Sequence, residues 1–203
     1  MNNPTEVIQG SVEWFALRLG KVTASKVADV MSKGTGRATY MDDLLAERMS
    51  GQSKPSFTND AMRWGTEQEP YARQAYEVDQ ECFVEETGFW EHDELALGVS
   101  PDGLVGEGGL VEIKCPNSST HVGWLRAKKV PAKHIKQIQC QLWVTGRSWC
   151  DFVSFDPRMI EAKNRLMVVR CERDDALIAK MELEVRKFLT ELDGWTKGDP
   201  DEQ

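Results

Sequence analysis

The chain has 203 residues, of which 40% are hydrophobic and 29% are charged, and its formal net charge is −8. This size and composition are typical of a globular protein with one core, so we expect residues 1–203 to form a single domain. The acidic net charge excludes a protein that coats DNA over its whole surface. The sequence has no basic leader and no apolar run of ~18 residues, so we expect a cytoplasmic protein with no membrane partner.

The N-terminal part of the chain predicts helices joined by short connections. Residues 11–31 indicate a helix, a turn at Gly20 and a second helix that begins near Thr23. The segment 32–40 is rich in glycine, serine and threonine, which predicts a mobile loop. A further helix is expected over about 40–50.

The next part changes from helix to strand. A long helix is predicted over about 59–79, with Asn59 as its N-cap. Residues 81–114 then read as strands, because apolar and β-branched residues alternate with polar ones. Two of these strands are joined by a tight glycine-rich connection that contains Gly106, Gly108 and Gly109.

The remaining elements alternate between helix and strand. Helices are predicted over 121–129, 132–144 and 174–192, and strands over 149–155 and 165–171. The pattern indicates an α/β fold with a small mixed central sheet flanked by helices.

Cysteine and histidine give no sign of a metal or disulfide framework. The five cysteines are scattered, odd in number and never spaced as CxxC, so we expect reduced thiols that are mostly buried. The three histidines are far apart and match no zinc spacing, so we expect structural or surface roles.

Two strand segments carry the residues that indicate chemistry. Asp102 lies in a turn-forming SPDG sequence, and Glu112 and Lys114 follow in the next strand. Because side chains alternate along a strand, Glu112 and Lys114 share a face while Ile113 points into the core. A hairpin would bring Asp102 across from Glu112, and with the Ile113 carbonyl between them these oxygens suit a hard cation such as Mg²⁺.

A bare Glu-x-Lys pattern is common on solvated strands and by itself indicates nothing. Here the flanking residues are apolar, and charges in such a run need a metal or each other. A metal ion at this place supplies an activated water for phosphodiester hydrolysis, and Lys114 beside it orients that water or offsets charge in the transition state.

The order of five motifs resembles the lambda exonuclease/YqaJ-type viral recombinase family and covers nearly the whole chain. The motifs are WFALRLGKVTAS (14–25), RWGTEQEPYA (63–72), SPDGL (100–104), VEIKCP (111–116) and QIQCQLWVTG (137–146). The resemblance implies a restriction-endonuclease-like PD-(D/E)XK core and 5′→3′ digestion of one strand at double-stranded DNA ends, which leaves a 3′ single strand for recombination. It also implies Mg²⁺, with Mn²⁺ as a substitute and two ions per site, a homotrimeric ring, a partner single-strand annealing protein and a phage-type protein in the bacterial cytoplasm.

The family's functional residues carry over by position. Asp102 and Glu112 match the metal-binding carboxylates, Lys114 matches the active-site lysine, and Glu69 matches a helix-borne acid, with Glu67 in reserve. The pocket for the 5′-phosphate corresponds to Arg18, Ser25, Ser100 and Gln137. From the residues alone, Ser25 fits an ordinary helix cap as well as a phosphate ligand at a helix start, and Gln137 fits a plain polar stripe with Gln141.

A basic group indicates a path for the DNA backbone. Its members are Arg126, Lys128, Lys129, Lys133 and Lys136, although such a cluster is also typical of a solvated face. The resemblance places the predicted 32–40 loop where the family inserts residues that help part the strands at the DNA end; Arg37 is the candidate for this role, and Lys33 is a further DNA-binding candidate.

Two other functions remain open at this point. A restriction- or RecB-type nuclease shares the chemistry, but an internal cutter has no need for a terminal-phosphate pocket. A DNA-end-binding module without catalysis is the other alternative, and the complete Asp102, Glu112 and Lys114 set argues against it.

Overall fold

The computed structural model describes residues 4–53 and 59–197. Its main sheet has five strands in the order β2-β5-β6-β7-β8. These are β2 (Val84–Glu85), β5 (Gly103–Val105), β6 (Gly109–Lys114), β7 (Trp149–Phe155) and β8 (Leu166–Glu172). Strands β6 and β7 are parallel and the other neighbours are antiparallel. The predicted α/β class with a small mixed sheet is therefore confirmed.

The β5–β6 hairpin sets the register on which the site depends. Its strands pair Gly103 with Val111 and Val105 with Gly109. Gly106 turns the chain with a φ of 53°, in the left-handed region that favours glycine. Glycine is required at position 109 for a different reason, because a Cβ there would lie 2.2 Å from the ring of Trp149. The residue before β5 thus lies opposite the middle of β6.

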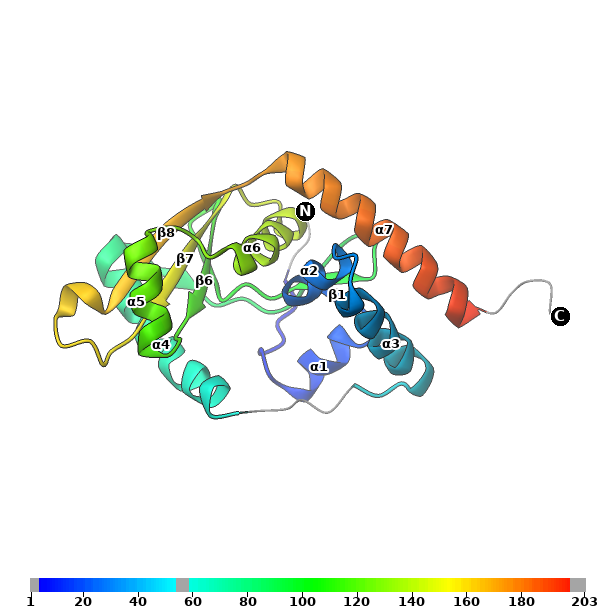
Figure 1. Cartoon of the computed structure of the whole chain (residues 1–203), viewed down its shortest axis with the longest axis horizontal. Coiled ribbons are helices and arrows are strands. Elements are labelled where there is room, and N and C mark those ends of the chain that lie inside the picture. The colour runs from blue at the N-terminus through cyan, green and yellow to red at the C-terminus, as the bar shows by residue number, and fades with distance from the viewer. Residues whose placement is uncertain (1–3, 54–58, 198–203) are drawn as a thin grey trace.

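Helices cover both faces of this sheet (Figure 1). Helix α4 (Asp60–Gln80) packs on one face, where Tyr76 contacts a cluster that includes Val111 and Ile113. Helix α6 (Ala132–Thr145) packs on the other face, over residues that include Leu110 and Phe152, and α7 (Asp175–Lys197) packs against α6. The parallel pair β6 and β7 is connected through α5 (Ser118–Ala127) and α6, as a parallel connection requires.

The N-terminal segment packs beside this core. It comprises α1 (Val12–Arg18), β1 (Val22–Thr23), the 3₁₀ turn η1 (Ala24–Lys26), α2 (Val27–Val30) and α3 (Thr35–Ser50). Strand β1 joins β4 (Leu97–Val99) and β3 (Trp90–Glu91) in a second, three-stranded sheet. Helix α3 lies along α7 (Figure 1), where the rings of Tyr40 and Phe188 stack with centroids 5.8 Å apart. A second 3₁₀ turn, η2 (Ala162–Asn164), precedes β8.

Several elements agree closely with the sequence. Asn59 caps α4 by accepting a hydrogen bond from the Met62 amide. Strand β7 has the predicted bounds, and α6 ends at Gly146, whose φ is 70°. None of the five cysteines forms a disulfide. Within residues 4–53 and 59–197, no helix has the length and apolar character that crossing a membrane requires.

Two predictions about the N-terminal segment were wrong. The mobile loop at 32–40 is absent, because α3 begins at Thr35 and buries Tyr40, Met41 and Leu44. This tertiary burial outweighs the weak helix propensity of its glycine- and threonine-rich start. The second helix also differs, since β1 and η1 come first and α2 has only four residues.

Candidate active site

Glu112 is the centre of the site and is 0% exposed, on the face of β6 that α6 covers. Its Oε1 accepts a hydrogen bond from Gln137 Nε2 at 2.7 Å and lies 2.5 Å from Lys114 Nζ. Its Oε2 accepts a hydrogen bond from Gln141 Nε2, also at 2.7 Å. A buried carboxylate needs such partners, because burial otherwise makes a charge very costly.

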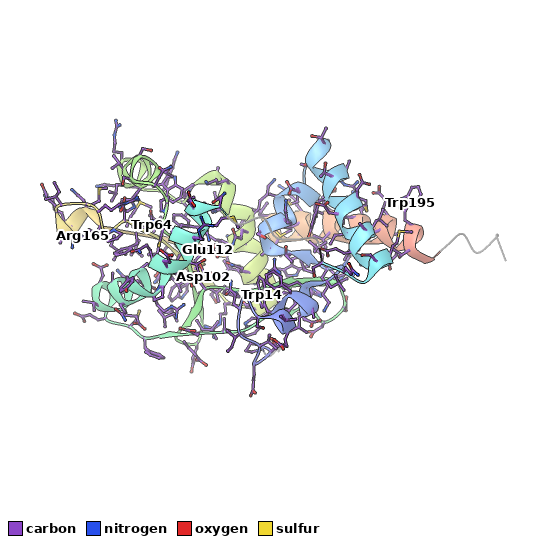
Figure 2. The ribbon with its side chains drawn as sticks, turned by 90° about the horizontal axis from the view of Figure 1, so that it is seen from below. Trp14, Trp64, Asp102, Glu112, Arg165 and Trp195 are labelled. Atoms are coloured by element: carbon purple, nitrogen blue, oxygen red, sulfur yellow. The ribbon has the colours of Figure 1, made fainter. Side chains whose placement is uncertain are left out.

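Asp102 comes from the turn before β5 and lies beside Glu112 (Figure 2). Its Oδ2 accepts a hydrogen bond from the backbone amide of Ile113 at 2.7 Å. Burial raises the pKa of Asp102 well above its ordinary value, and the negative charge of Glu112 raises it further. The hairpin therefore brings two carboxylates together at a cost in electrostatic energy.

Lys114 and Glu69 complete this charged cluster. Burial by itself lowers the pKa of Lys114, but Glu112, Asp102 and Glu69 together outweigh it, and the net pKa is raised. Glu69 is half-buried on α4 and lies 3.2 Å from Arg73. Burial raises the pKa of Glu69, with opposing effects of Arg73 and Lys114. The reserve candidate Glu67 is exposed, so Glu69 is the acid that α4 turns toward the site.

The donor set fits a hard divalent cation. Asp102, Glu112 and Glu69 offer carboxylate oxygens, which Mg²⁺ and Mn²⁺ prefer. One further oxygen, Gln141 Oε1, is buried without a hydrogen-bond partner among the described residues. Among the described residues, no three acidic, histidine or cysteine side chains lie close enough together in this structure to hold an ion. The backbone contact of Ile113 is made by its amide, and its carbonyl as a ligand stays a prediction.

Three residues connect α1 with the segment before Asp102. The guanidinium of Arg18 lies over the ring of Trp14 at 4.0 Å from the centroid. Trp14 Nε1 in turn donates a hydrogen bond to Ser100 Oγ at 2.9 Å. Trp14 is buried, so this contact fixes α1 against the chain two residues before Asp102. Arg18 and Ser100 are thus brought together through an aromatic ring.

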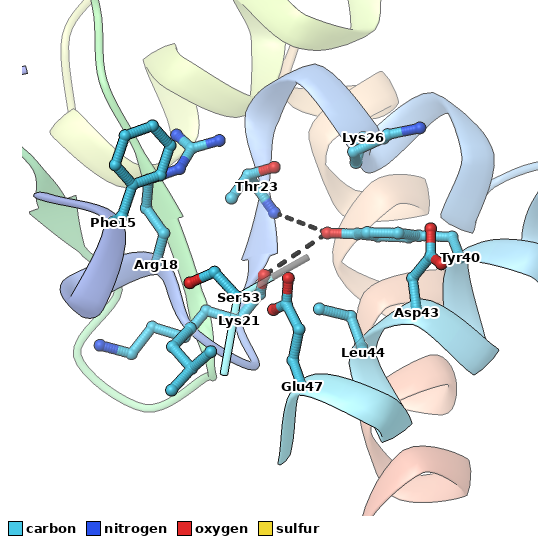
Figure 3. A pocket seen from close by; sticks show the side chains of 11 residues that line it. Phe15, Arg18, Lys21, Thr23, Lys26, Tyr40, Asp43, Leu44, Glu47 and Ser53 are labelled. Carbon is cyan, nitrogen blue, oxygen red and sulfur yellow. Dashed lines mark hydrogen bonds between the residues drawn. The ribbon is translucent and has the colours of Figure 1, made fainter. Parts of the chain in front are cut away.

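Arg18 also lines a cavity of about 210 Å³ between α1 and α3 (Figure 3). Tyr40 lies across it; its hydroxyl accepts from the Thr23 amide at 3.2 Å and donates to the Lys21 carbonyl at 3.4 Å. Burial raises the pKa of Tyr40 to about 12. Burial lowers the pKa of Arg18, against the influence of Tyr40 and Glu47. Among the described residues, the guanidinium of Arg18 makes no hydrogen bond and no ion pair, so its donors remain available to an anion.

Ser25 and Gln137 lie on neighbouring elements, because the 3₁₀ turn η1 packs against α6. Ser25 is exposed and its Oγ lies 3.5 Å from Thr23 Oγ1. The expected helix start is too short for a strong dipole, since α2 has four residues. Any phosphate contact of Ser25 therefore depends on its hydroxyl.

The predicted DNA-contacting residues have different surroundings. Arg126, Lys128 and Lys33 are exposed. Arg37 belongs to the first turn of α3, where it lies 2.5 Å from Glu191 and its guanidinium is over the ring of Phe188. The loop expected around Arg37 was wrong, because this residue lies on α3 and contacts α7, while its DNA contact stays a prediction.

Sequence reasoning missed two contributors to the site. Trp14 was named only as the first residue of a motif, and Gln141 was noted only as a helical neighbour of Gln137. The i, i+4 spacing of the two glutamines was the available signal, because it places both amides on one side of α6. Their common target, Glu112, is 25 and 29 residues away in the chain.

Comparisons with known proteins agree with this geometry. Residues 13–148 match the YqaJ-like viral recombinase domain. The crystal structure of an alkaline exonuclease from Laribacter hongkongensis superimposes with a TM-score of 0.88 at 48% identity, over 92% of this chain and 95% of that one. The same exonuclease in complex with dAMP gives the same values.

A phage-related exonuclease from Haemophilus somnus 129PT shares the fold at 19% identity, with a TM-score of 0.66 over 87% of this chain and 95% of the other. No protein with a curated description matches this chain in sequence. The core is restriction-endonuclease-like, as expected, and the predicted resemblance is confirmed. From the match to two thirds of its length and the 48% identity, the chain belongs to the YqaJ-like viral recombinase family.

Proposed function

We propose that this protein is a Mg²⁺-dependent exonuclease that digests one strand of linear double-stranded DNA in the 5′→3′ direction. Deoxyribonuclease activity follows from the family and from the alkaline exonuclease that is 48% identical. The observation that carries the finer proposal is the buried Glu112, with Asp102 and Lys114 beside it on one hairpin.

The carboxylates of Asp102, Glu112 and Glu69 would hold the cations, two Mg²⁺ ions per site, with Mn²⁺ as a substitute. A divalent cation there supplies an activated water and offsets the charge of the phosphodiester. Lys114 orients the attacking water and stabilises the transition state, because its ammonium is held within the carboxylate cluster. Gln137 fixes one oxygen of Glu112 and thereby the face that Glu112 presents.

Arg18, Ser25, Ser100 and Gln137 would bind the terminal 5′-phosphate. Arg18 supports this role, since its guanidinium is half-buried, lies over the ring of Trp14 and forms no ion pair with a carboxylate in the described part of the chain. A guanidinium of this kind grips phosphate bidentately. Ser100 Oγ accepts from Trp14, which leaves its own proton free to donate. An enzyme that cuts internally would gain nothing from such a pocket.

We further propose an assembly, a set of DNA contacts, a partner protein and a cellular location. Because the net charge is −8, tight hold on DNA requires a confined contact, and a homotrimeric ring around the duplex provides one. Arg126, Lys128 and Lys33 would contact the backbone, and a single-strand annealing protein would receive the 3′ strand. The DNA substrate places the protein in the cytoplasm of a bacterial cell, and residues 1–203 would act as one domain.

The first test incubates the protein with linear duplex DNA labelled at one 5′ or 3′ end, and separately with uniformly labelled circular duplex DNA. We expect release of mononucleotides from the 5′ ends of the linear duplex with Mg²⁺, none with EDTA, and intact circles. Release from 3′ ends would contradict the polarity, and cleavage of circles would favour a restriction-type nuclease. Binding without cleavage under any metal condition would favour a non-catalytic end-binding module.

A second test compares duplexes with a 5′-phosphate and a 5′-hydroxyl. The wild type should digest the phosphorylated end faster, and Arg18→Ala should lose this preference. Lys163→Ala is the control, because Lys163 is an exposed lysine on η2, which lies at the edge of the molecule away from α1 (Figure 1). Equal rates of the wild type on both ends would remove Arg18 from the mechanism.

A further inference from the structure

Gln141 lies at the back of the site and is 0% exposed. Its Nε2 donates a hydrogen bond to Glu112 Oε2 at 2.7 Å, opposite the oxygen that Gln137 and Lys114 contact. Its Oε1 is buried and has no hydrogen-bond partner among the described residues. One end of this amide therefore holds a catalytic carboxylate, while its other end is an acceptor that is left unsatisfied.

The neighbouring Gln139 shows what a purely structural buried amide looks like on the same helix. It is 1% exposed, its Nε2 donates to the Glu172 carbonyl at 2.8 Å, and its Oε1 accepts from the Asp174 amide at 2.8 Å. Both ends of Gln139 are satisfied by backbone, and the side chain ties α6 to the start of α7. Gln141 has no such role.

An unsatisfied buried acceptor is costly, and an apolar side chain of similar volume would avoid the cost. The amide of Gln141 is therefore not explained by packing. Its donor end is explained by Glu112, because a carboxylate held by donors on both oxygens cannot rotate about its terminal bond. Its acceptor end is also buried, and a water that hydrates a bound cation would be a donor able to satisfy it.

We propose that Gln141 is a positioning residue that orients Glu112 for the divalent cation. With Gln137 on Oε1 and Gln141 on Oε2, α6 fixes the plane of the carboxylate, and Gln141 Oε1 remains available to water around the ion. This inference rests on the proposed metal-dependent function. It adds a requirement that the metal affinity, and not only the rate, depends on Gln141.

The experiment titrates Mn²⁺ into metal-free protein by isothermal calorimetry, for the wild type, Gln141→Met and Gln139→Met. Removing a group that hydrogen-bonds to a metal ligand typically lowers metal affinity by about 10–100-fold. We expect a loss of this size for Gln141→Met. Gln139→Met should bind Mn²⁺ as the wild type does but unfold at lower temperature, because it loses structural hydrogen bonds. The Mg²⁺ concentration for half-maximal nuclease rate should rise only for Gln141→Met, and saturating Mg²⁺ should restore most of the rate.

The outcomes distinguish the proposed metal-dependent function from the proposed role of Gln141. If the wild type binds no Mn²⁺, the metal-dependent function itself fails. If the wild type and Gln141→Met bind Mn²⁺ equally, the function stands and the role of Gln141 is refuted. Should Gln141→Met not fold, Gln141→Asn keeps the amide but shortens it by one methylene, and the same loss of Mn²⁺ affinity is expected.

Discussion

Asp102→Asn should stabilise the metal-free protein while it abolishes cleavage. The folded structure holds the pKa of Asp102 well above its ordinary value of 3.8, through burial and through the charge of Glu112. A raised carboxyl pKa means that the ionised form is less favourable in the folded state than in the unfolded state. Ionised Asp102 therefore costs stability; this cost is absent below the unfolded pKa, grows as the pH rises from the unfolded to the folded pKa, and is complete above the folded pKa.

The size of the effect follows from the surrounding groups. Glu112 and Glu69 repel the ionised carboxylate of Asp102 while Lys114 attracts it, so these charge effects oppose one another and partly cancel. The burial cost remains, while the asparagine carbonyl still accepts the Ile113 amide. We expect a net gain of about 1–2 kcal/mol, within the usual range of single substitutions. For a chain of this length that corresponds to roughly 2–8 °C in Tm.

Thermal unfolding followed by tryptophan fluorescence measures this directly, in EDTA at pH 8 and near pH 4. The gain of Asp102→Asn should be larger at pH 8 than near pH 4, and added Mg²⁺ should stabilise the wild type alone. Asp156→Asn is a control of opposite sign. Burial alone would raise the pKa of Asp156, but hydrogen bonds from Arg158 and Ser118 lower it, so its loss should reduce Tm at pH 8. A lower Tm for Asp102→Asn in EDTA at pH 8 would refute the reasoning.

Three further predictions concern single contacts. Lys114→Ala should reduce turnover by about 10²–10³-fold while Mn²⁺ still binds by calorimetry, because the lysine acts on the transition state; near-normal turnover would exclude this role. Tyr76→Phe removes the 2.8 Å hydrogen bond to buried Asp151 and should cost about 1.5 kcal/mol in urea unfolding, with the nuclease rate unchanged. Gly109→Ala should cost about 1–3 kcal/mol, because its Cβ would meet the Trp149 ring; a stability equal to wild type would show that the ring moves aside freely.

The sequence by itself determined the elements whose signals are local. The alternation of Val111 and Ile113 with Glu112 and Lys114 predicted the two faces of β6, and both faces are as expected. The cap at Asn59 predicted the start of α4. Such signals rest on side chains a few residues apart, which interact through helix and strand geometry before any tertiary contact forms. The order of the motifs also predicted the family, because proteins that share a fold keep their functional residues in the same order along the chain.

The tertiary structure decided everything that depends on contacts distant in sequence. Helix α3 exists from Thr35 because its buried side chains pack against α7, although its first residues favour a loop. Trp14 reaches Ser100 across 86 residues, and Gln141 reaches Glu112 across 29. Contacts between residues this far apart depend on how the sheet and helices pack together. The intervening chain is flexible and does not fix the distance between such residues until the core forms. Local periodicity therefore fixes which face a side chain occupies, and only the packed layers fix which groups it meets there.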